Sequence, residues 1–283
     1  MNQEPRKIAK MIEPQAVVEG AGVRLKRSIG TRALDYLDPF LLLDHFQSKN
    51  PADYQAGFPL HPHRGIETVT YLLAGAVRHR DSVGNAGEIG AGDLQWMSAG
   101  RGILHEEMPQ VRPEGVAGFQ LWVNLPAKQK MSAPRYQNLH ASEIPVVERD
   151  NGVTVRVICG KVDGVSGPIT GIVAEPTYLD VALAAGGTFT QAVPRGHSAF
   201  AYLFEGEARF GAEDKRIVTA PKLMAWSDGD GIEVRADKNS ARFLLVSGQP
   251  LNETVARYGP FVMNTQAEIE QTLRELQAGT FAR

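Results

Sequence analysis

The chain has 283 residues, of which 43% are hydrophobic, and its 30 basic and 32 acidic side chains give a formal charge of -2. This composition is that of a globular protein and excludes a disordered chain. The near-neutral charge lacks the basic field that binds phosphates, so we expect no direct nucleic-acid partner. No run approaches the roughly 20 apolar residues of a spanning helix, so we expect no membrane partner. The single cysteine, Cys159, favours the reducing cytoplasm.

Short segments rich in β-branched and aromatic residues recur along the chain, and Gly or Pro bounds most of them. The segments with the length and composition of strands include 67–73, 94–97, 119–124, 153–159, 178–183, 201–204 and 241–247. No helical pattern separates them, which argues against alternating β-α units. We therefore expect an all-β sandwich or barrel of antiparallel strands.

An internal similarity divides the chain into two nearly equal parts. The sequence YLLAGA at 71–76 resembles YLFEGE at 202–207, which begins 131 positions later. This favours a duplicated domain, and the alternative is chance agreement between two strand-turn units. We expect an N-terminal domain over 1–130 and a C-terminal domain over 131–283, with the stretch 126–145 as their boundary.

The last 25 residues have a different pattern. Thr265 and Glu268 have the spacing of a capping box, in which the hydroxyl and the carboxylate each bond a backbone amide of the first turn. Ile269, Leu273 and Leu276 follow on one helical face. A short C-terminal helix is predicted here, packed on a domain surface.

The histidines indicate a metal site. His61 and His63 are two residues apart, so on a strand both imidazoles point to one face. His105 and Glu107 repeat this spacing. If the two segments pair as neighbouring strands, three imidazoles and one carboxylate converge at one point. The alternative is that these are surface or hydrogen-bonded histidines, which is what we expect for His45, His79 and His140.

The segment 57–67 (GFPLHPHRGIE), followed by Gly75, has the His-x-His-x3-Glu core of the cupin superfamily. Over nearly its whole length the chain resembles the pirin family. The other stretches that carry this resemblance are 27–30, 38–46, 92–97, 99–109, 120–126 and 259–265. The resemblance implies a bicupin with two antiparallel β-barrel (jelly-roll) domains, of which the N-terminal one binds metal.

The family's four metal ligands map onto His61, His63, His105 and Glu107. Glu67 stands where many other cupins place their ligand carboxylate, so it is the rival fourth ligand, and we favour Glu107 with Glu67 behind it. This ligand set leaves one or two positions open on a six-coordinate ion, as oxygen-activating ferrous sites require. The resemblance implies Fe(II), while imidazole ligands also suit Mn, Ni, Cu or Zn.

The second half lacks these ligands. The offset of 131 places Ala192, Pro194 and Ser198 at the positions equivalent to the two strand histidines and Glu67. His197 lies nearby but has no histidine partner at strand spacing. We therefore expect a metal-free C-terminal cupin domain and one metal per chain.

The resemblance implies quercetin 2,3-dioxygenase activity, in which a flavonol reacts with dioxygen and loses carbon monoxide. Glu107, or Glu67 behind it, would accept the proton of the flavonol hydroxyl. The alternative is an iron-dependent regulatory binding protein that acts on a transcription factor or a metabolic enzyme, with a protein partner and no obligatory catalysis. We expect a monomer.

Several residues near the ligands are candidates for binding the substrate. Arg64 and Arg101 could hold an anionic group, or could instead form salt bridges that position a carboxylate. The candidates for lining an aromatic pocket, each with core packing as its alternative role, are Phe58, Gln95, Met97, Gln120 and Trp122.

Overall fold

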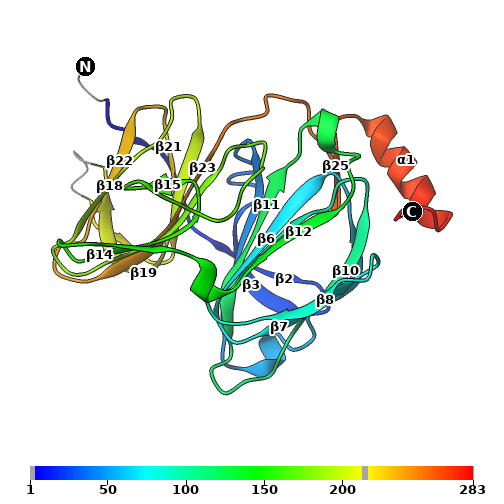
Figure 1. The fold of residues 1–283 in the computed structure, drawn as a ribbon, viewed down its shortest axis with the longest axis horizontal. Helices are drawn as coiled ribbons and strands as arrows, with labels where there is room; N and C mark the ends of the chain where they lie inside the picture. The colour runs from blue at the N-terminus through cyan, green and yellow to red at the C-terminus, as the bar shows by residue number, and fades with distance from the viewer. Residues whose placement is uncertain (1–3, 212–215, 283) are drawn as a thin grey trace. The chain divides into compact units, whose positions relative to one another are not determined.

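The structure of the chain is a computed structural model, and it describes residues 4–211 and 216–282 (Figure 1). Strands dominate these residues, and the one α-helix among them is α1 (Gln266–Gln277). The predicted all-β class with a short C-terminal helix is therefore confirmed. The chain divides into two compact units. One, which we call the histidine unit, comprises Gln15–Ala141 and the segment from Leu251 onward, and the other comprises the residues up to Pro14 and Ser142–Pro250.

Two antiparallel sheets form the histidine unit. The seven-stranded sheet, in the order β12-β9-β6-β11-β4-β3-β2, contains β2 (Gln15–Glu19), β3 (Val23–Ile29), β4 (Phe40–Ser48), β6 (Ile66–Ala74), β9 (Leu94–Ser98), β11 (Val116–Asn124) and β12 (Arg135–Leu139). The four-stranded sheet, in the order β5-β10-β7-β8, contains β5 (Phe58–His63), β7 (Val77–Asp81), β8 (Ala86–Ile89) and β10 (Ile103–Pro109). Short 3-10 helices occupy Pro51–Asp53, Ala127–Gln129 and Ala141–Glu143.

Side chains of the two sheets meet in one core. Val23, Leu25 and Leu72 of the larger sheet pack with Val77 and Ile89 of the smaller. Both sheets end in free edge strands, so the unit is a jelly-roll sandwich rather than a closed barrel.

A polar row crosses the inner face of the seven-stranded sheet. Strand register places Gln95 beside Thr70, Thr70 beside Gln120, Gln120 beside Asp44, and Asp44 beside Arg27. Directly opposed residues on neighbouring strands point to the same face, so these five side chains form a continuous line. We call them the polar row.

The C-terminal segment belongs to the histidine unit. A hairpin of β24 (Ala256–Tyr258) and β25 (Phe261–Met263) precedes α1, and the buried Ile269 of the helix packs in one cluster with Phe261, Met263 and Phe281. The capping box of Thr265 and Glu268 is present, as predicted. The sequence pattern thus located this helix correctly and placed it on a surface.

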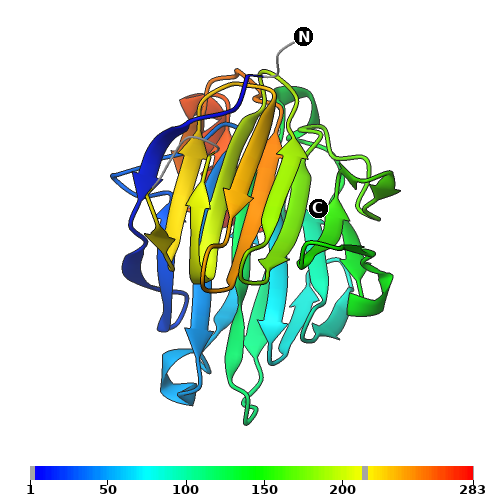
Figure 2. The same cartoon turned by 90° about the vertical axis from the view of Figure 1, so that its left-hand side faces the viewer.

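The other unit is built on a ten-stranded antiparallel sheet, seen in Figure 2. Its main path runs through β1 (Ile8–Ile12), β21 (Lys222–Trp226), β19 (Ser198–Phe210), β23 (Ala241–Gly248), β17 (Thr177–Leu183), β14 (Val153–Cys159) and β13 (Val146–Arg149). Off this path lie β18 (Thr188–Ala192), β20 (Val218–Thr219) and β22 (Gly231–Arg235), and a separate hairpin pairs β15 (Lys161–Val162) with β16 (Val165–Ser166).

The two compact units are not contiguous in sequence. Strand β1 pairs with β21, so the N-terminal strand joins the unit built mainly from the second half. The segment after Pro250 instead joins the unit built mainly from the first half. The N-terminal strand and the segment after Pro250 therefore do not follow a simple division of the chain at residue 130, because strands distant in sequence pair with one another.

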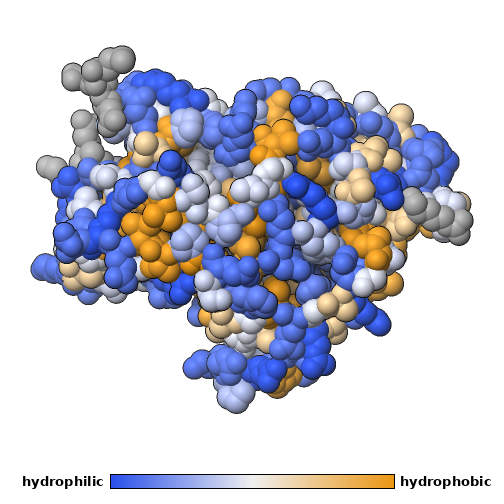
Figure 3. All heavy atoms as spheres, in the orientation of Figure 1, coloured by the Kyte–Doolittle hydropathy of each residue, from blue (hydrophilic) through white to orange (hydrophobic). Residues whose placement is uncertain are grey.

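The surface gives no sign of a large apolar patch on the face drawn in Figure 3, where hydrophobic residues form separate groups divided by hydrophilic ones. Among the described residues, no helix has the length and hydropathy needed to span a membrane.

Candidate metal centre

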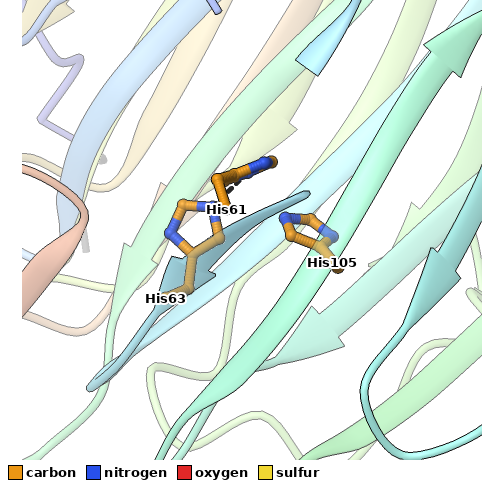
Figure 4. Close-up of side chains that lie close together, drawn as sticks. All are labelled: His61, His63 and His105. Atoms are coloured by element: carbon orange, nitrogen blue, oxygen red, sulfur yellow. Dashed lines mark hydrogen bonds between the residues drawn. The ribbon is translucent and has the colours of Figure 1, made fainter. Parts of the chain in front are cut away.

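Strand pairing brings the three predicted histidines together. β5 and β10 are antiparallel neighbours, with His105 opposite His61 and Ile103 opposite His63 (Figure 4). The potential ligand nitrogens of all three rings lie within 4.8 Å of one another. Nε2 of His61 is 3.1 Å from Nε2 of His63, and the ring centroids of His61 and His105 are 4.4 Å apart. The i, i+2 spacing on one strand and direct pairing with the next produce this cluster.

Burial keeps the imidazoles in the form that binds metals. His63 and His105 are 3% and 2% exposed. Desolvation lowers the pKa of His105 to about 3 and holds that of His63 well below its ordinary value, and the neighbouring rings add to both shifts. Both rings are therefore neutral near pH 7, with a lone pair available for a metal.

Unpartnered nitrogens show that a cation fits this cluster. Among the described residues, neither ring nitrogen of His105 has a hydrogen-bond partner, although both atoms are buried. A buried polar atom without a partner is costly and calls for an explanation such as an ion. Three imidazoles are a donor set that suits Fe, Ni, Cu or Zn.

The two candidate carboxylates lie on different faces. Glu107 shares the inner face with His105, two residues before it on β10, and Oε1 of Glu107 accepts a hydrogen bond from Oγ1 of Thr70 at 3.0 Å. Its carboxylate is not one of the groups within 4.8 Å of the others. Of the two candidates, Glu107 is nevertheless the one that lines the same cavity as His61 and His63.

Glu67 points away from the histidines, contrary to its role as a rival ligand or a base. It is three residues from Thr70 on β6, so strand alternation turns it to the opposite face. Its Oε1 accepts a hydrogen bond from Oγ of Ser98 at 2.5 Å. Burial raises the pKa of Glu67, while Ser98 and Trp96 lower it through hydrogen bonds. Sequence spacing alone could not separate the two carboxylates.

A cavity of about 620 Å³ opens beside the histidines. This volume is within the roughly 300–1,000 Å³ of typical small-molecule sites. Its apolar wall includes Leu25, Phe46, Tyr54, Phe58, Val77 and Trp122. Its polar groups include His61, His63, Thr70, Glu107, Gln120 and Arg257. A planar apolar ligand with a few polar oxygens matches such a lining.

Phe58, Gln120 and Trp122 are the predicted pocket residues that line this cavity. The Trp122 ring lies edge-on to His63 at 5.1 Å. The remaining candidates lie elsewhere: Met97 is a fully buried core residue, and Gln95 donates to Oδ1 of Asn138 at 3.2 Å.

The two predicted arginines are not in the cavity lining either. Arg101 is exposed, and its backbone carbonyl accepts a hydrogen bond from Nε of Arg64. Arg64 is 2% exposed and its guanidinium points to the C-terminal segment, where it pairs with Glu275 at 2.7 Å and lies over the ring of Phe281. The salt-bridge alternative applies to Arg64, and its partner is Glu275 rather than Glu67 or Glu107.

Other cavity residues were missed from the sequence. Arg257 lies over Trp122 at 5.2 Å, and with Gly259 and Pro260 it comes from the C-terminal segment, about 200 positions from the histidines. No local pattern links these distant segments. Thr70 was missed because Glu67 was expected to point toward the metal, and alternation along the strand then turns Thr70 to the other face.

A chain of two jelly-roll β units with one three-histidine cluster on paired strands is a bicupin with a single candidate metal centre among the described residues. The Pirin family profile matches residues 22–123, and that of the Pirin C-terminal cupin domain matches residues 178–282. The chain therefore belongs to the pirin family.

Relatives and solved structures agree over almost the full length. The chain is 46% identical to a pirin-like protein of Caulobacter vibrioides, covering 98% of this chain and 99% of the relative. It is 43% identical to human pirin, covering 96% and 92%. The crystal structure of quercetin 2,3-dioxygenase from Acinetobacter baumannii superimposes with a TM-score of 0.88 at 35% identity, covering 98% and 99%.

Proposed function

We propose that the chain is a metal-dependent dioxygenase that cleaves flavonols such as quercetin. The observation that carries this proposal is the cluster of three imidazoles beside a cavity with aromatic walls. The likeness to a structure named quercetin 2,3-dioxygenase supports the substrate class. The single cysteine, Cys159, is consistent with a cytoplasmic location.

His61, His63 and His105 would hold the metal, with Glu107 as the fourth ligand, and Fe(II) is the proposed ion. When bound, a divalent metal supplies Lewis-acid polarisation of a substrate oxygen and a template for the reaction with dioxygen. Mn, Ni, Cu and Zn are the other ions that the site could accept.

The protein's own residues bind and orient the substrate. Phe58 and Trp122 offer aromatic surface to the flat rings of a flavonol, and the apolar wall keeps bulk water from the reacting carbons. Glu107 lines the cavity together with His61 and His63 and would accept the proton of the flavonol hydroxyl.

The test is anaerobic loading with ferrous ion, metal analysis, and then a quercetin assay in air. We expect His63→Ala to lose both bound metal and activity. The matched control is His140→Ala, whose side chain is 79% exposed, and which should retain both. Equal activity in wild type and His63→Ala would contradict a metal-centred reaction. Stoichiometric metal without flavonol turnover would instead favour the regulatory binding protein that acts on a partner protein.

A further inference from the structure

A hydrogen bond joins the two sheets of the histidine unit at Glu107. Thr70 lies on β6 of the seven-stranded sheet and Glu107 on β10 of the four-stranded sheet. Oγ1 of Thr70 donates to Oε1 of Glu107 at 3.0 Å. Thr70 is 4% exposed, so water cannot readily replace this donor. The carboxylate is therefore oriented by a side chain from the opposite sheet.

Gln120 stands directly behind this hydroxyl. Its amide oxygen Oε1 lies 2.7 Å from Oγ1 of Thr70, so the hydroxyl of Thr70 is within donating distance of both Gln120 and Glu107. A hydroxyl carries one proton and can donate to only one of them. A carboxylate oxygen is a stronger acceptor than an amide oxygen, so we assign the proton to the bond with Glu107. Exchanging Oε1 and Nε2 of the Gln120 amide, an assignment that the hydrogen-bond network decides, then lets its N–H donate to the oxygen of Thr70 and completes a directed chain from Gln120 through Thr70 to Glu107.

The rest of the polar row holds this chain in place. Gln120 is flanked by Asp44, whose two carboxylate oxygens are each bonded at 2.7 Å by the guanidinium of Arg27. Asp44 is thus satisfied by a bidentate ion pair. The other oxygen of Glu107, Oε2, accepts no hydrogen bond from the described residues, so it is the oxygen that remains available in the cavity.

We propose that Thr70, supported by Gln120, is the positioning residue that fixes Glu107 beside the histidines and presents its Oε2 to the metal. This inference rests on the proposed metal site. It distinguishes Glu107 from Glu67, whose donor Ser98 holds it on the other face of β6. A hydrogen-bonded partner of a ligand typically affects metal affinity by about 10- to 100-fold.

The experiment measures Mn²⁺ binding to the metal-free full chain by the EPR signal of the free ion, which needs no catalysis. We expect Thr70→Val to weaken binding about 10- to 100-fold and Thr70→Ser, which keeps the hydroxyl, to restore it. In a Glu107→Ala background, Thr70→Val should change the affinity no further, because its effect acts through the carboxylate. Gln120→Met serves as a second variant and should also weaken binding.

The inference would be overturned if Thr70→Val left the Mn²⁺ affinity unchanged. It would also be overturned if Thr70→Val lowered this affinity as much in the Glu107→Ala background as in wild type. If Thr70→Val does not fold, the comparison of Gln120→Met in the two backgrounds decides in the same way. A wild type that binds Mn²⁺ but does not cleave quercetin contradicts the dioxygenase and leaves this comparison intact. If wild type binds no metal, crystal structures decide: a Glu107 carboxylate equally placed in the Thr70→Val and Thr70→Ser variants refutes the positioning role.

Discussion

Replacing Arg64 by methionine separates a structural role from a substrate-binding one. The guanidinium donates to the carbonyl oxygens of Arg101 and Phe281 and to Oγ1 of Thr272, and it pairs with Glu275. All of these bonds are lost in Arg64→Met, which removes the buried charge but keeps an apolar stem. A hydrogen bond to a charged group contributes roughly 1.5–3 kcal/mol, so three at the low end of this range amount to about 4.5 kcal/mol.

The assay is equilibrium unfolding in urea, followed by tryptophan fluorescence, with quercetin kinetics on the same preparations. We expect Arg64→Met to lower the free energy of unfolding of the histidine unit by about 4.5 kcal/mol. The control is Arg101→Met, since its side chain is exposed, and it should change stability by less than about 0.5 kcal/mol. An Arg64→Met protein that is as stable as wild type and has a raised KM would refute the structural role of Arg64 and favour the substrate-binding alternative.

Three further changes test other parts of the chain. Desolvation lowers the pKa of the buried His45 to about 4, with Lys26 adding to the shift, so the unfolded chain takes up a proton near pH 6.5 that the folded chain refuses until about pH 4. Stability should therefore fall across this window by up to about 3 kcal/mol, and urea unfolding at several pH values should show a smaller fall in His45→Phe. Thr265→Ala removes the capping box and should lower the free energy of unfolding by about 1 kcal/mol, as measured by thermal unfolding, whereas Thr265→Ser should leave it unchanged. His197→Ala should leave one metal per chain by elemental analysis, and loss of an equivalent would contradict a single site.

Local spacing and the resemblance to the pirin family together predicted the histidine cluster. His61 and His63 share a face of β5 by strand periodicity, and the repeat of this spacing at His105 predicted a second strand beside it. The capping box likewise located α1, because its signals lie within four residues of one another. Such features depend on neighbours in sequence, so a single chain is enough to find them.

Features that depend on distant pairing were not found in this way. The sequence could not show that Arg64 points to Phe281, or that Arg257 reaches Trp122, since no local pattern couples these positions. Of the two alternatives expected for His79, a surface position is wrong, because His79 is 9% exposed and its ring stacks near that of Tyr136. Burial of a polar side chain depends on what covers it, which spacing alone does not reveal.

The discontinuous make-up of the histidine unit has a consequence for synthesis. Its cavity takes Arg257, Gly259 and Pro260 from the segment after Pro250, whereas its strands up to β12 end at Leu139. The whole of Ser142–Pro250 must therefore leave the ribosome before the cavity can be completed. Translation proceeds at about 5–20 residues per second, so the sheets of the histidine unit lack this part of the cavity lining for several seconds or more. During this time the apolar side chains of the cavity are exposed. A chaperone that binds during this interval would protect the incomplete cavity from aggregation.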